Sequence, residues 1–485
     1  MTDPHATRTA VLRGEADGYN MGKERLMGRQ AAGNGFLRAA VQARGDQPIR
    51  SLSPNAASAR GFAAIVAGID PRASVEWIPT DQFGRVAETG VFYLADITVG
   101  THARLRQRDG AAAVSLCGVT HTTASAGAMD EIANLLREPV MPWDALFCTT
   151  GAVVETVRRV HDVEAEYLRW RHGRDIRLEL PQLPIIPLGV HCDDFAISAD
   201  ARATARADLG LDPDTVVALF VGRLIFHGKA HPVAMYQGLQ AAAARAGRPI
   251  TLIMCGWAPH DGITQAFVSG AAQFAPDVRT IFVEGRDPPK RDQAWAAADL
   301  FVSLADNIQE TFGLTPIEAM AAGLPVVVTD WNGYRDTVRH GVDGFRIATW
   351  APGPGMGEPL ARGHENGALS YDRYCWAAAA TTSVDLQDLT DTLSRPFGHY
   401  PTHQIAAATI LTIASGATVA DLHAALGQAL FSELPAPAAQ LETLYNLAAA
   451  GPLTVHDAAI RISASLPTIA RAAGVLAKIG VVRLG

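Results

Sequence analysis

The chain has 485 residues, of which 48% are hydrophobic and 19% are charged, and its net charge is −8. This composition excludes a disordered tail, and the length predicts about three domains. The negative balance excludes a nucleic-acid binder that depends on bulk positive charge, although it leaves room for a local basic patch.

The cysteines and the amino-terminal segment indicate the cellular compartment in which the protein is expected. Five widely spaced cysteines form neither a disulfide framework nor a zinc motif, which predicts reduced thiols in a cytosol. The first thirty residues hold no apolar core of a signal peptide. The uncharged stretch 405–420 is too short to span a membrane and is interpreted as a buried helix. We therefore expect a cytoplasmic protein, with peripheral attachment to the inner face of the membrane as an alternative.

Residues 1–195 are predicted to form a first α/β domain. The runs 112–116 and 145–148 indicate strands, and the stretches 57–68 and 129–136 indicate helices. Residues 183–189 contain two prolines and are interpreted as the end of this domain and the start of a linker.

Residues 196–400 are predicted to form a second α/β domain of the doubly wound type. Unbroken apolar runs alternate here with alanine-rich stretches of helical length, which indicates a parallel sheet covered on both faces. The apolar runs are 216–221, 250–254, 280–283, 300–304 and 326–328.

Residues 401–485 are rich in alanine and leucine and are predicted to form a helical extension. Residues 451–485 resemble a winged helix, with two helices followed by a short strand. This segment has only four basic residues against one acidic residue, too few to neutralise the phosphates of DNA. Packing against the other domains or self-association into a homo-oligomer is therefore favoured over DNA binding.

The segment 310–325, ETFGLTPIEAMAAGLP, contains the clearest local signals. Thr315, Pro316 and Glu318 fit a capping box at the start of a helix over 316–322, and Gly323 fits its carboxyl end. The amides of Gly313 and the next two residues would then point out of the positive end of this helix, where a phosphate binds favourably.

Two cations follow another predicted strand. Arg223 and Lys229 lie in the loop after 216–221, and an arginine with a lysine suits a diphosphate. By themselves, a capped helix and two solvated cations are ordinary features. The carboxyl ends of neighbouring parallel strands meet at one edge, however, so these loops are expected to converge on a cleft that binds a phosphate-bearing ligand.

The same residues resemble a known family. Glu310 and Glu318 are separated by seven residues, which is the E-x7-E signature of the retaining GT-B glycosyltransferases of family 4. The VGRL motif, the downstream Lys229 and the FG loop also resemble this family. The resemblance extends over 110–350 and is strongest over 216–346. Residues 187–190, PLGV, resemble the interdomain segment of the family, although His191 stands where an aspartate is common.

This resemblance implies a GT-B fold, with two Rossmann-like doubly wound domains facing a cleft, and a nucleoside-diphosphate sugar as co-substrate with no bound cofactor. Arg223 and Lys229 would hold the diphosphate, Glu318 the ribose, and Glu310 the transferred sugar. The remaining donor-binding residues implied in the second domain are Phe312, Gly313, Leu314, Thr315, Gly222, Gly256 and Arg286.

The first domain is expected to contribute two elements to the site. His121 follows a predicted strand and would lie near the sugar and the acceptor. The segment 28–36 fits the family's glycine-containing loop, in which Gly33 and Gly35 would approach the donor phosphates.

The predicted chemistry is the departure of a nucleoside diphosphate, whose growing charge Arg223, Lys229 and the helix start would stabilise. No DxD pair is suited to hold a divalent ion there, so no metal is required. Front-face and covalent routes to retention both stay open, as does the acceptor, which could be a glycan, a lipid or a small molecule.

Three alternatives share this fold: a nucleotide-sugar epimerase, a phosphorylase, and a non-catalytic regulator with a DNA-reading tail. A phosphorylase that uses pyridoxal phosphate needs a lysine for its cofactor, but Lys229 and Lys290 both lie in ligand-loop contexts. The intact Glu310, Glu318, Arg223 and Lys229 argue against a degenerate regulator.

Overall fold

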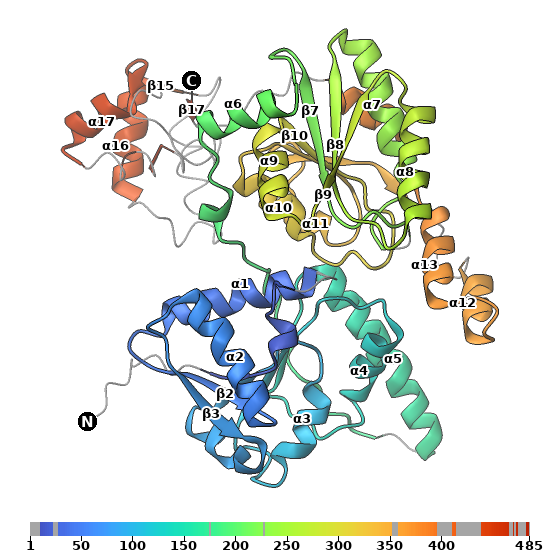
Figure 1. The fold of residues 1–485 in the computed structure, drawn as a ribbon. Helices are drawn as coiled ribbons and strands as arrows, with labels where there is room; N and C mark the ends of the chain where they lie inside the picture. Colours follow the sequence, from blue (N-terminus) through green and yellow to red (C-terminus); the bar gives the residue numbers. More distant parts are fainter. Residues whose placement is uncertain are drawn as a thin grey trace. The chain divides into compact units, whose positions relative to one another are not determined.

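The computed structural model describes residues 10–22, 28–173, 176–226, 228–351, 357–394, 410–413, 438–464, 469, 472–473 and 482–484. The chain forms two compact units, Met1–His399 and Tyr400–Gly485 (Figure 1). The first unit contains two six-stranded sheets, and the second contains a three-stranded sheet. Of the helices that the structure describes, none is both long and apolar enough to cross a membrane.

The first sheet is parallel throughout and has the strand order β3-β2-β1-β4-β5-β6. In this Rossmann order the chain starts in the middle, winds to one edge, and then returns to wind toward the other. The strands are β1 (Val11–Arg13), β2 (Ile49–Ser53), β3 (Val75–Pro79), β4 (Val91–Tyr93), β5 (Ser115–Val119) and β6 (Ala145–Phe147). The helices are α1 (Gly28–Ala43), α2 (Ala56–Ile69), α3 (Val99–Arg106), α4 (Ala126–Asn134) and α5 (Gly151–His172).

The second sheet is also parallel, with the order β12-β11-β10-β7-β8-β9, which is the same topology. Its strands are β7 (Val216–Val221), β8 (Ile250–Gly256), β9 (Arg279–Glu284), β10 (Leu300–Ser303), β11 (Val326–Thr329) and β12 (Gly344–Ile347). The helices of this domain are α6 (Ala199–Asp208), α7 (Val233–Ala246), α8 (Asp261–Phe274), α9 (Pro288–Ala297), α10 (Leu314–Ala321), α11 (Tyr334–Thr337), α12 (Glu358–Glu365), α13 (Tyr371–Ala380) and α14 (Leu386–Leu393). A two-stranded ribbon joins β13 (Thr349–Trp350) to β14 (Ser383–Val384). The predicted α/β class with two Rossmann-like domains is confirmed.

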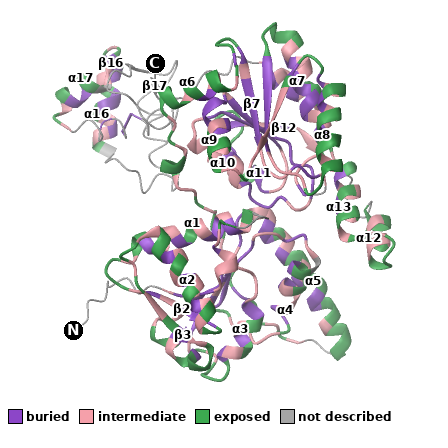
Figure 2. Cartoon of the chain, viewed as in Figure 1, coloured by how far each residue is buried: buried purple, intermediate pink, exposed green. Residues whose placement is uncertain are grey.

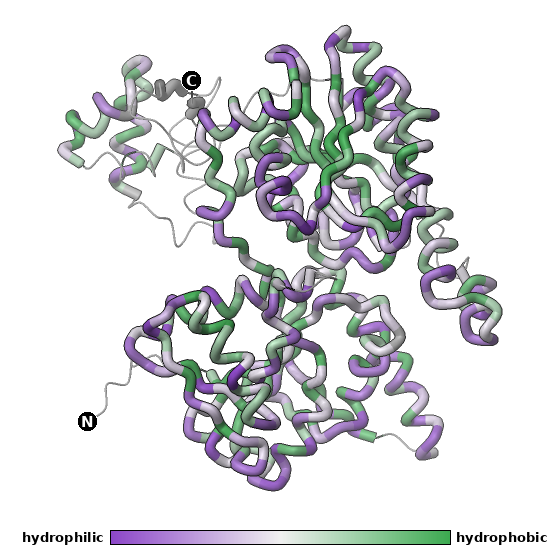
Figure 3. The backbone as a smooth tube through the Cα atoms, in the orientation of Figure 1, coloured by the Kyte–Doolittle hydropathy of each residue, from purple (hydrophilic) through white to green (hydrophobic). Residues whose placement is uncertain are grey.

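Strand β7 shows why the sequence marks this sheet so clearly. Val217 and Leu219 pack into one hydrophobic cluster, and Ala218 and Phe220 pack into another. Because both faces of the strand are buried, every position must be apolar. The central strands are accordingly buried in Figure 2 and hydrophobic in Figure 3.

One strand of the first sheet lies later in the chain than expected. Strand β5 spans Ser115–Val119, whereas 112–116 was predicted. Residues before it form a turn, in which the amide of Ala113 donates to the carbonyl of Gly110. An apolar run therefore begins before the strand does.

The second unit is not only helical. Its antiparallel sheet has the order β16-β15-β17, with β15 (Ile410–Ile413), β16 (Leu453–Thr454) and β17 (Val482–Leu484). Its described helices are α16 (Ala438–Ala449) and α17 (Val455–Ile462). The prediction of a buried helix over 405–420 is wrong at β15, where β-branched residues pair with two distant strands. Most of the last helix expected in this segment lies outside the described residues.

A buried ion pair holds the first domain together at the end of α3. Both side chains of Arg106 and Asp144 are fully buried, with Nη1–Oδ1 and Nη2–Oδ2 distances of 2.5 and 2.9 Å. Asp144 also accepts hydrogen bonds from the amides of Leu116 and Met141.

Replacing Arg106 by methionine should therefore lower the free energy of unfolding by about 3–5 kcal/mol, because Asp144 is left charged, buried and without its ion-pair partner. Thermal unfolding followed by calorimetry measures this loss. The control is Arg159→Met, which removes an exposed pair with Glu155 and should change stability by about 0.5 kcal/mol or less. Equal losses in the two variants would contradict a structural role for the buried pair.

Candidate functional site

The candidate site lies at the carboxyl ends of β7 and β10, where the strand order of the second sheet reverses. Ligands of open α/β sheets bind in this crevice. Three glycines lie at or just after the ends of β7, β8 and β9, namely Gly222, Gly256 and Gly285, and let the backbones approach closely. A Cβ atom on Gly256 would lie 1.9 Å from the carbonyl oxygen of Gly222, and one on Gly285 would lie 2.9 Å from the Cα of Gly256. Close packing therefore explains Gly256 and Gly285, and the contact of Gly222 and Gly256 with a donor stays a prediction.

Lys229 and Glu310 meet in this crevice. The Lys229 Nζ atom lies 3.3 Å from Glu310 Oε2, and the side chains are 29% and 9% exposed. The loop that carries Lys229 is held by the loop after β10. Asn307 donates through Nδ2 to the carbonyl of Lys229, and the amide of His231 donates to Asp306 at 3.0 Å. The two loops therefore form one assembly.

Arg223 belongs to the same assembly. It is partly buried, and burial lowers the pKa of its guanidinium, whereas the negative charges of Asp372 and Glu310 raise it. Arg223 and Lys229 thus both lie within electrostatic reach of Glu310. Together they place positive charge where the resemblance implies a diphosphate.

Helix α10 starts earlier than predicted. It spans Leu314–Ala321, its N-cap is Gly313 with a φ of 87°, and no side chain caps it. The capping box of Thr315 and Glu318 is therefore wrong, because the left-handed turn at Gly313 brings the chain into the helix two residues sooner. The carboxyl end is as expected: the amides of Gly323 and Leu324 donate to Met320 and Ala319 in a Schellman motif.

Glu318 lies on α10, within electrostatic reach of Lys229 and of a further cation, Arg291. Burial raises the pKa of its carboxyl to about 7, while the positive charges of Arg291 and Lys229 lower it. A carboxyl whose pKa is shifted this far toward neutrality changes charge in the physiological range.

Two elements of the first domain reach the loop that carries Glu310. The hydroxyl of Thr311 donates to the carbonyl of His121, and the hydroxyl of Thr150 donates to the carbonyl of Thr311 at 2.9 Å. The ring of His121 lies 2.9 Å, through Nε2, from the carbonyl of Ala95, so Nε2 carries the proton. Burial lowers the pKa of this imidazole, which keeps it neutral at pH 7.

The prediction of a glycine-containing loop over residues 28–36 of the first domain is wrong, because these residues are helical. Gly33 and Gly35 lie inside α1, which begins at Gly28. A Cβ atom on Gly33 would lie 2.1 Å from the carbonyl oxygen of Gly18, so this glycine is required where the helix packs on the chain after β1. Contact of either glycine with a donor stays a prediction.

Arg286 forms an ion pair and a cation–π contact with residues outside the group around Glu310. Its guanidinium binds Glu284, with Nε–Oε1 at 2.8 Å, and lies over the ring of Trp257, 5.5 Å from the centroid. The structure thus brings Arg223, Lys229, Glu310 and Glu318 together and places Arg286 in a separate ion pair at the end of β9.

The residues that hold these loops were not singled out from the sequence. Asp306 and Asn307 are a polar pair in the loop after β10, which ends at Ser303, and that position was a usable signal. Burial raises the pKa of Asp306 to about 7, and its Oδ1 has no hydrogen-bond partner among the described residues. Tyr334, which contacts Glu310, lies 24 residues away and carried no signal in the sequence.

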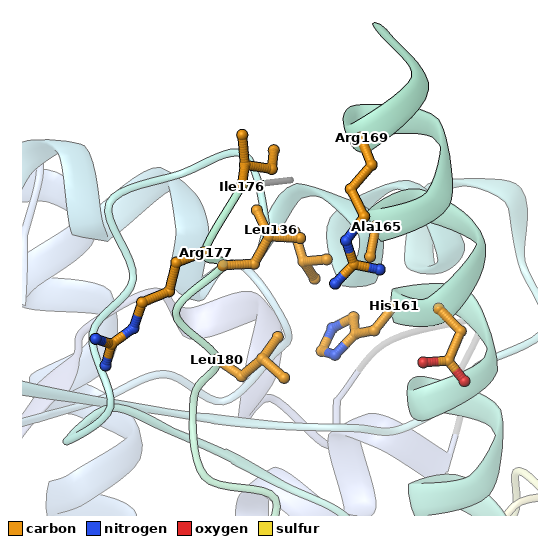
Figure 4. Close-up of a pocket in the computed structure, with 9 residues that line it drawn as sticks. Leu136, His161, Ala165, Arg169, Ile176, Arg177 and Leu180 are labelled. Carbon is orange, nitrogen blue, oxygen red and sulfur yellow. The ribbon is translucent and has the colours of Figure 1, made fainter. Parts of the chain in front are cut away.

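A separate cavity of about 590 Å³ lies beside α5 in the first domain (Figure 4). Its lining includes Leu136, His161, Ala165, Arg169 and Leu180, and none of the predicted site residues. The imidazole of His161 lies 3.1 Å, through Nε2, from the carbonyl of Ile132, and burial lowers its pKa. In the part of the chain that the structure describes, no group of three or more histidine, cysteine or acidic side chains could hold a metal ion.

Comparison with known proteins finds a family match within the second domain. Residues 201–350 match the family model described as "Glycosyl transferases group 1". The D-inositol 3-phosphate glycosyltransferase of Nocardia farcinica is 33% identical over 181 residues, which is 36% of this chain and 36% of that protein. The enzyme of the same name from Segniliparus rotundus is 30% identical over 241 residues, which is 48% of this chain and 50% of that protein. The chain therefore spans half or less of the length of these relatives.

Two solved structures are also similar. Anabaena Alr3699/HepE in complex with UDP and glucose has 16% identity and a TM-score of 0.44, over 80% of this chain and 98% of that chain. A glycosyltransferase from Rickettsia africae has 11% identity and a TM-score of 0.46, over 80% and 95% of the two chains. The resemblance to group 1 glycosyltransferases is confirmed by the family match over residues 201–350.

Proposed function

Because residues 201–350 match the group 1 glycosyl transferases and the site groups two cations with two carboxylates, we propose that the chain is a retaining glycosyltransferase. It transfers a sugar from a nucleoside-diphosphate sugar to an acceptor that is a glycan, a lipid or a small molecule. The observation that carries this proposal is the convergence of Arg223, Lys229, Glu310 and the start of α10 at the switch point of the second sheet.

In this proposal each residue has a distinct role. Arg223 and Lys229, with the first amides of α10, stabilise the negative charge that grows on the leaving diphosphate. Glu318 accepts hydrogen bonds from the ribose hydroxyls, and Glu310 contacts the sugar being transferred. His121, whose Nε2 proton is held by the carbonyl of Ala95, can accept a hydrogen bond through Nδ1 near the sugar.

The cysteines support a reducing compartment. All five, Cys117, Cys148, Cys192, Cys255 and Cys375, are free thiols in the structure. We therefore propose a cytoplasmic location. Self-association through the second unit stays a prediction.

The function is tested by incubating the pure protein with a panel of nucleotide sugars and candidate acceptors and measuring released nucleoside diphosphate. D-inositol 3-phosphate belongs in the panel because two relatives carry it in their names. Release that depends on an acceptor, with the anomeric configuration of the donor kept in the product, supports the proposal. Conversion of the donor sugar without transfer indicates an epimerase, and binding without turnover indicates a regulator.

We predict that activity survives chelation. The two cations and the helix start supply the positive charge that a divalent ion would otherwise supply at the diphosphate. Turnover in excess EDTA should therefore equal turnover in buffer alone. Loss of activity in EDTA that magnesium or manganese restores would reveal a metal site and contradict this prediction.

A further inference from the structure

Tyr334 links the last residue of β10 to the carboxylate of the site. The tyrosine is 1% exposed, and its hydroxyl lies 2.8 Å from Ser303 Oγ and 3.5 Å from Glu310 Oε2. The same Oε2 atom faces Lys229 Nζ at 3.3 Å. A chain of contacts thus runs from the buried Ser303 through Tyr334 and Glu310 to the partly exposed Lys229.

The direction of these hydrogen bonds follows from the chemistry of the groups. An ionised carboxylate only accepts, so the phenol donates to Glu310 and its oxygen accepts from Ser303. Burial, followed by the negative charge of Glu310, raises the pKa of Tyr334 well above its ordinary value. The phenol therefore stays protonated and remains a donor throughout the physiological range.

The ring of Tyr334 also contacts the loop that opens α10. A Cβ atom on Gly313 would lie 2.3 Å from Tyr334 Cε1, and one on Gly333 would lie 2.1 Å from the carbonyl oxygen of Thr311. The hydroxyl of Thr337 donates to the carbonyl of Phe312 at 3.3 Å. Residues 333–337 therefore pack directly beneath residues 311–313.

We propose that Tyr334 is a positioning residue of the donor site, whose hydroxyl fixes the orientation of Glu310 and whose ring supports the turn at Gly313. The inference rests on the proposed function, because it assigns Glu310 to the transferred sugar. A carboxylate held by both Tyr334 and Lys229 has fewer orientations available, and small misplacements of a reacting group have large effects on rate. Tyr334 acts through Glu310 and does not itself contact the reacting atoms.

Tyr334→Phe separates positioning from packing, since it removes the hydroxyl and keeps the ring. We expect kcat to fall about 10-fold, while the dissociation constant for the nucleoside diphosphate changes by less than about 2-fold. Ser303→Ala, which removes the group that orients the phenol, should lower kcat in the same direction but less. The matched control is Tyr236→Phe, because Tyr236 is also fully buried in this domain and donates to the carbonyl of Phe267.

Thermal unfolding, nucleotide titration and turnover are measured for each variant beside the wild type. Tyr334→Phe and Tyr236→Phe should lose similar stability, and only Tyr334→Phe should lose turnover. Equal turnover in the two variants, or a parallel loss of turnover and nucleotide affinity in Tyr334→Phe, would overturn the inference. Absence of turnover in the wild type would instead count against the proposed function, and the inference would fall with it.

Discussion

Replacement of Lys229 by alanine should lower kcat/KM by about 100-fold or more, the effect expected for the loss of one group that stabilises charge in the transition state. Lys229 faces Glu310 at 3.3 Å and remains 29% exposed, so its charge is available to a bound diphosphate. The loop itself should keep its shape, because Asn307 and Asp306 hold it through the main chain of residues 229 and 231. Unfolding should therefore occur at nearly the wild-type temperature.

Lys290→Ala is the control for this substitution. Lys290 is the other lysine that the structure describes in the second domain, and it lies on α9 in a pair with Asp287 at 3.1 Å, with its side chain 59% exposed. Its removal should leave kcat/KM unchanged. Near-normal turnover of Lys229→Ala would remove the central electrostatic claim, whatever the control shows.

The fold of the second domain could be predicted because its strands are buried on both faces. β7, β8 and β10 appear in the sequence as unbroken apolar runs for this reason. β12 was not singled out, since its apolar run is interrupted by Arg346, whose guanidinium reaches Asp330. β15 was mistaken for a helix because its partners are remote segments whose pairing leaves no local periodicity.

Some residues of the candidate site could likewise be predicted from the sequence, and others could not. The carboxyl ends of the strands could be located from the sequence, and with them Arg223, Lys229 and Glu310. The T-x-x-E pattern at Thr315 was misleading, because the positive φ of Gly313 starts the helix earlier and leaves that threonine inside it. Tyr334 could not be found from the sequence, since its role depends on how two distant loops pack.

The two glutamates of the site should have separable roles. Glu318 lies on α10 within electrostatic reach of Lys229 and Arg291. Glu310 precedes the Gly313 turn and is contacted by Lys229 and Tyr334. Glu318→Gln should weaken the binding of the cognate nucleoside diphosphate by about 10-fold or more, because a charged acceptor for the ribose is replaced by a neutral one. Glu310→Gln should leave that affinity nearly unchanged and lower kcat by about 100-fold, because its contacts are to the group being transferred.

The pH dependence of nucleotide binding gives the sharper test of Glu318. Burial raises the pKa of this carboxyl to about 7, so in the free protein it loses its proton as the pH rises through neutrality. The ionised form is the stronger hydrogen-bond acceptor for the ribose hydroxyls, and affinity should therefore increase from pH 6 to pH 8. The terminal phosphate of the nucleotide also titrates near pH 6, by about one unit of charge, and this changes the affinity of both proteins. The informative quantity is therefore the difference in nucleotide affinity between the wild type and Glu318→Gln, measured by calorimetric titration at each pH. The difference should grow with pH. If the two proteins show the same pH profile, ionisation of Glu318 does not govern nucleotide binding. If Glu310→Gln is instead the variant that fails to bind nucleotide, the two glutamates have been assigned in reverse.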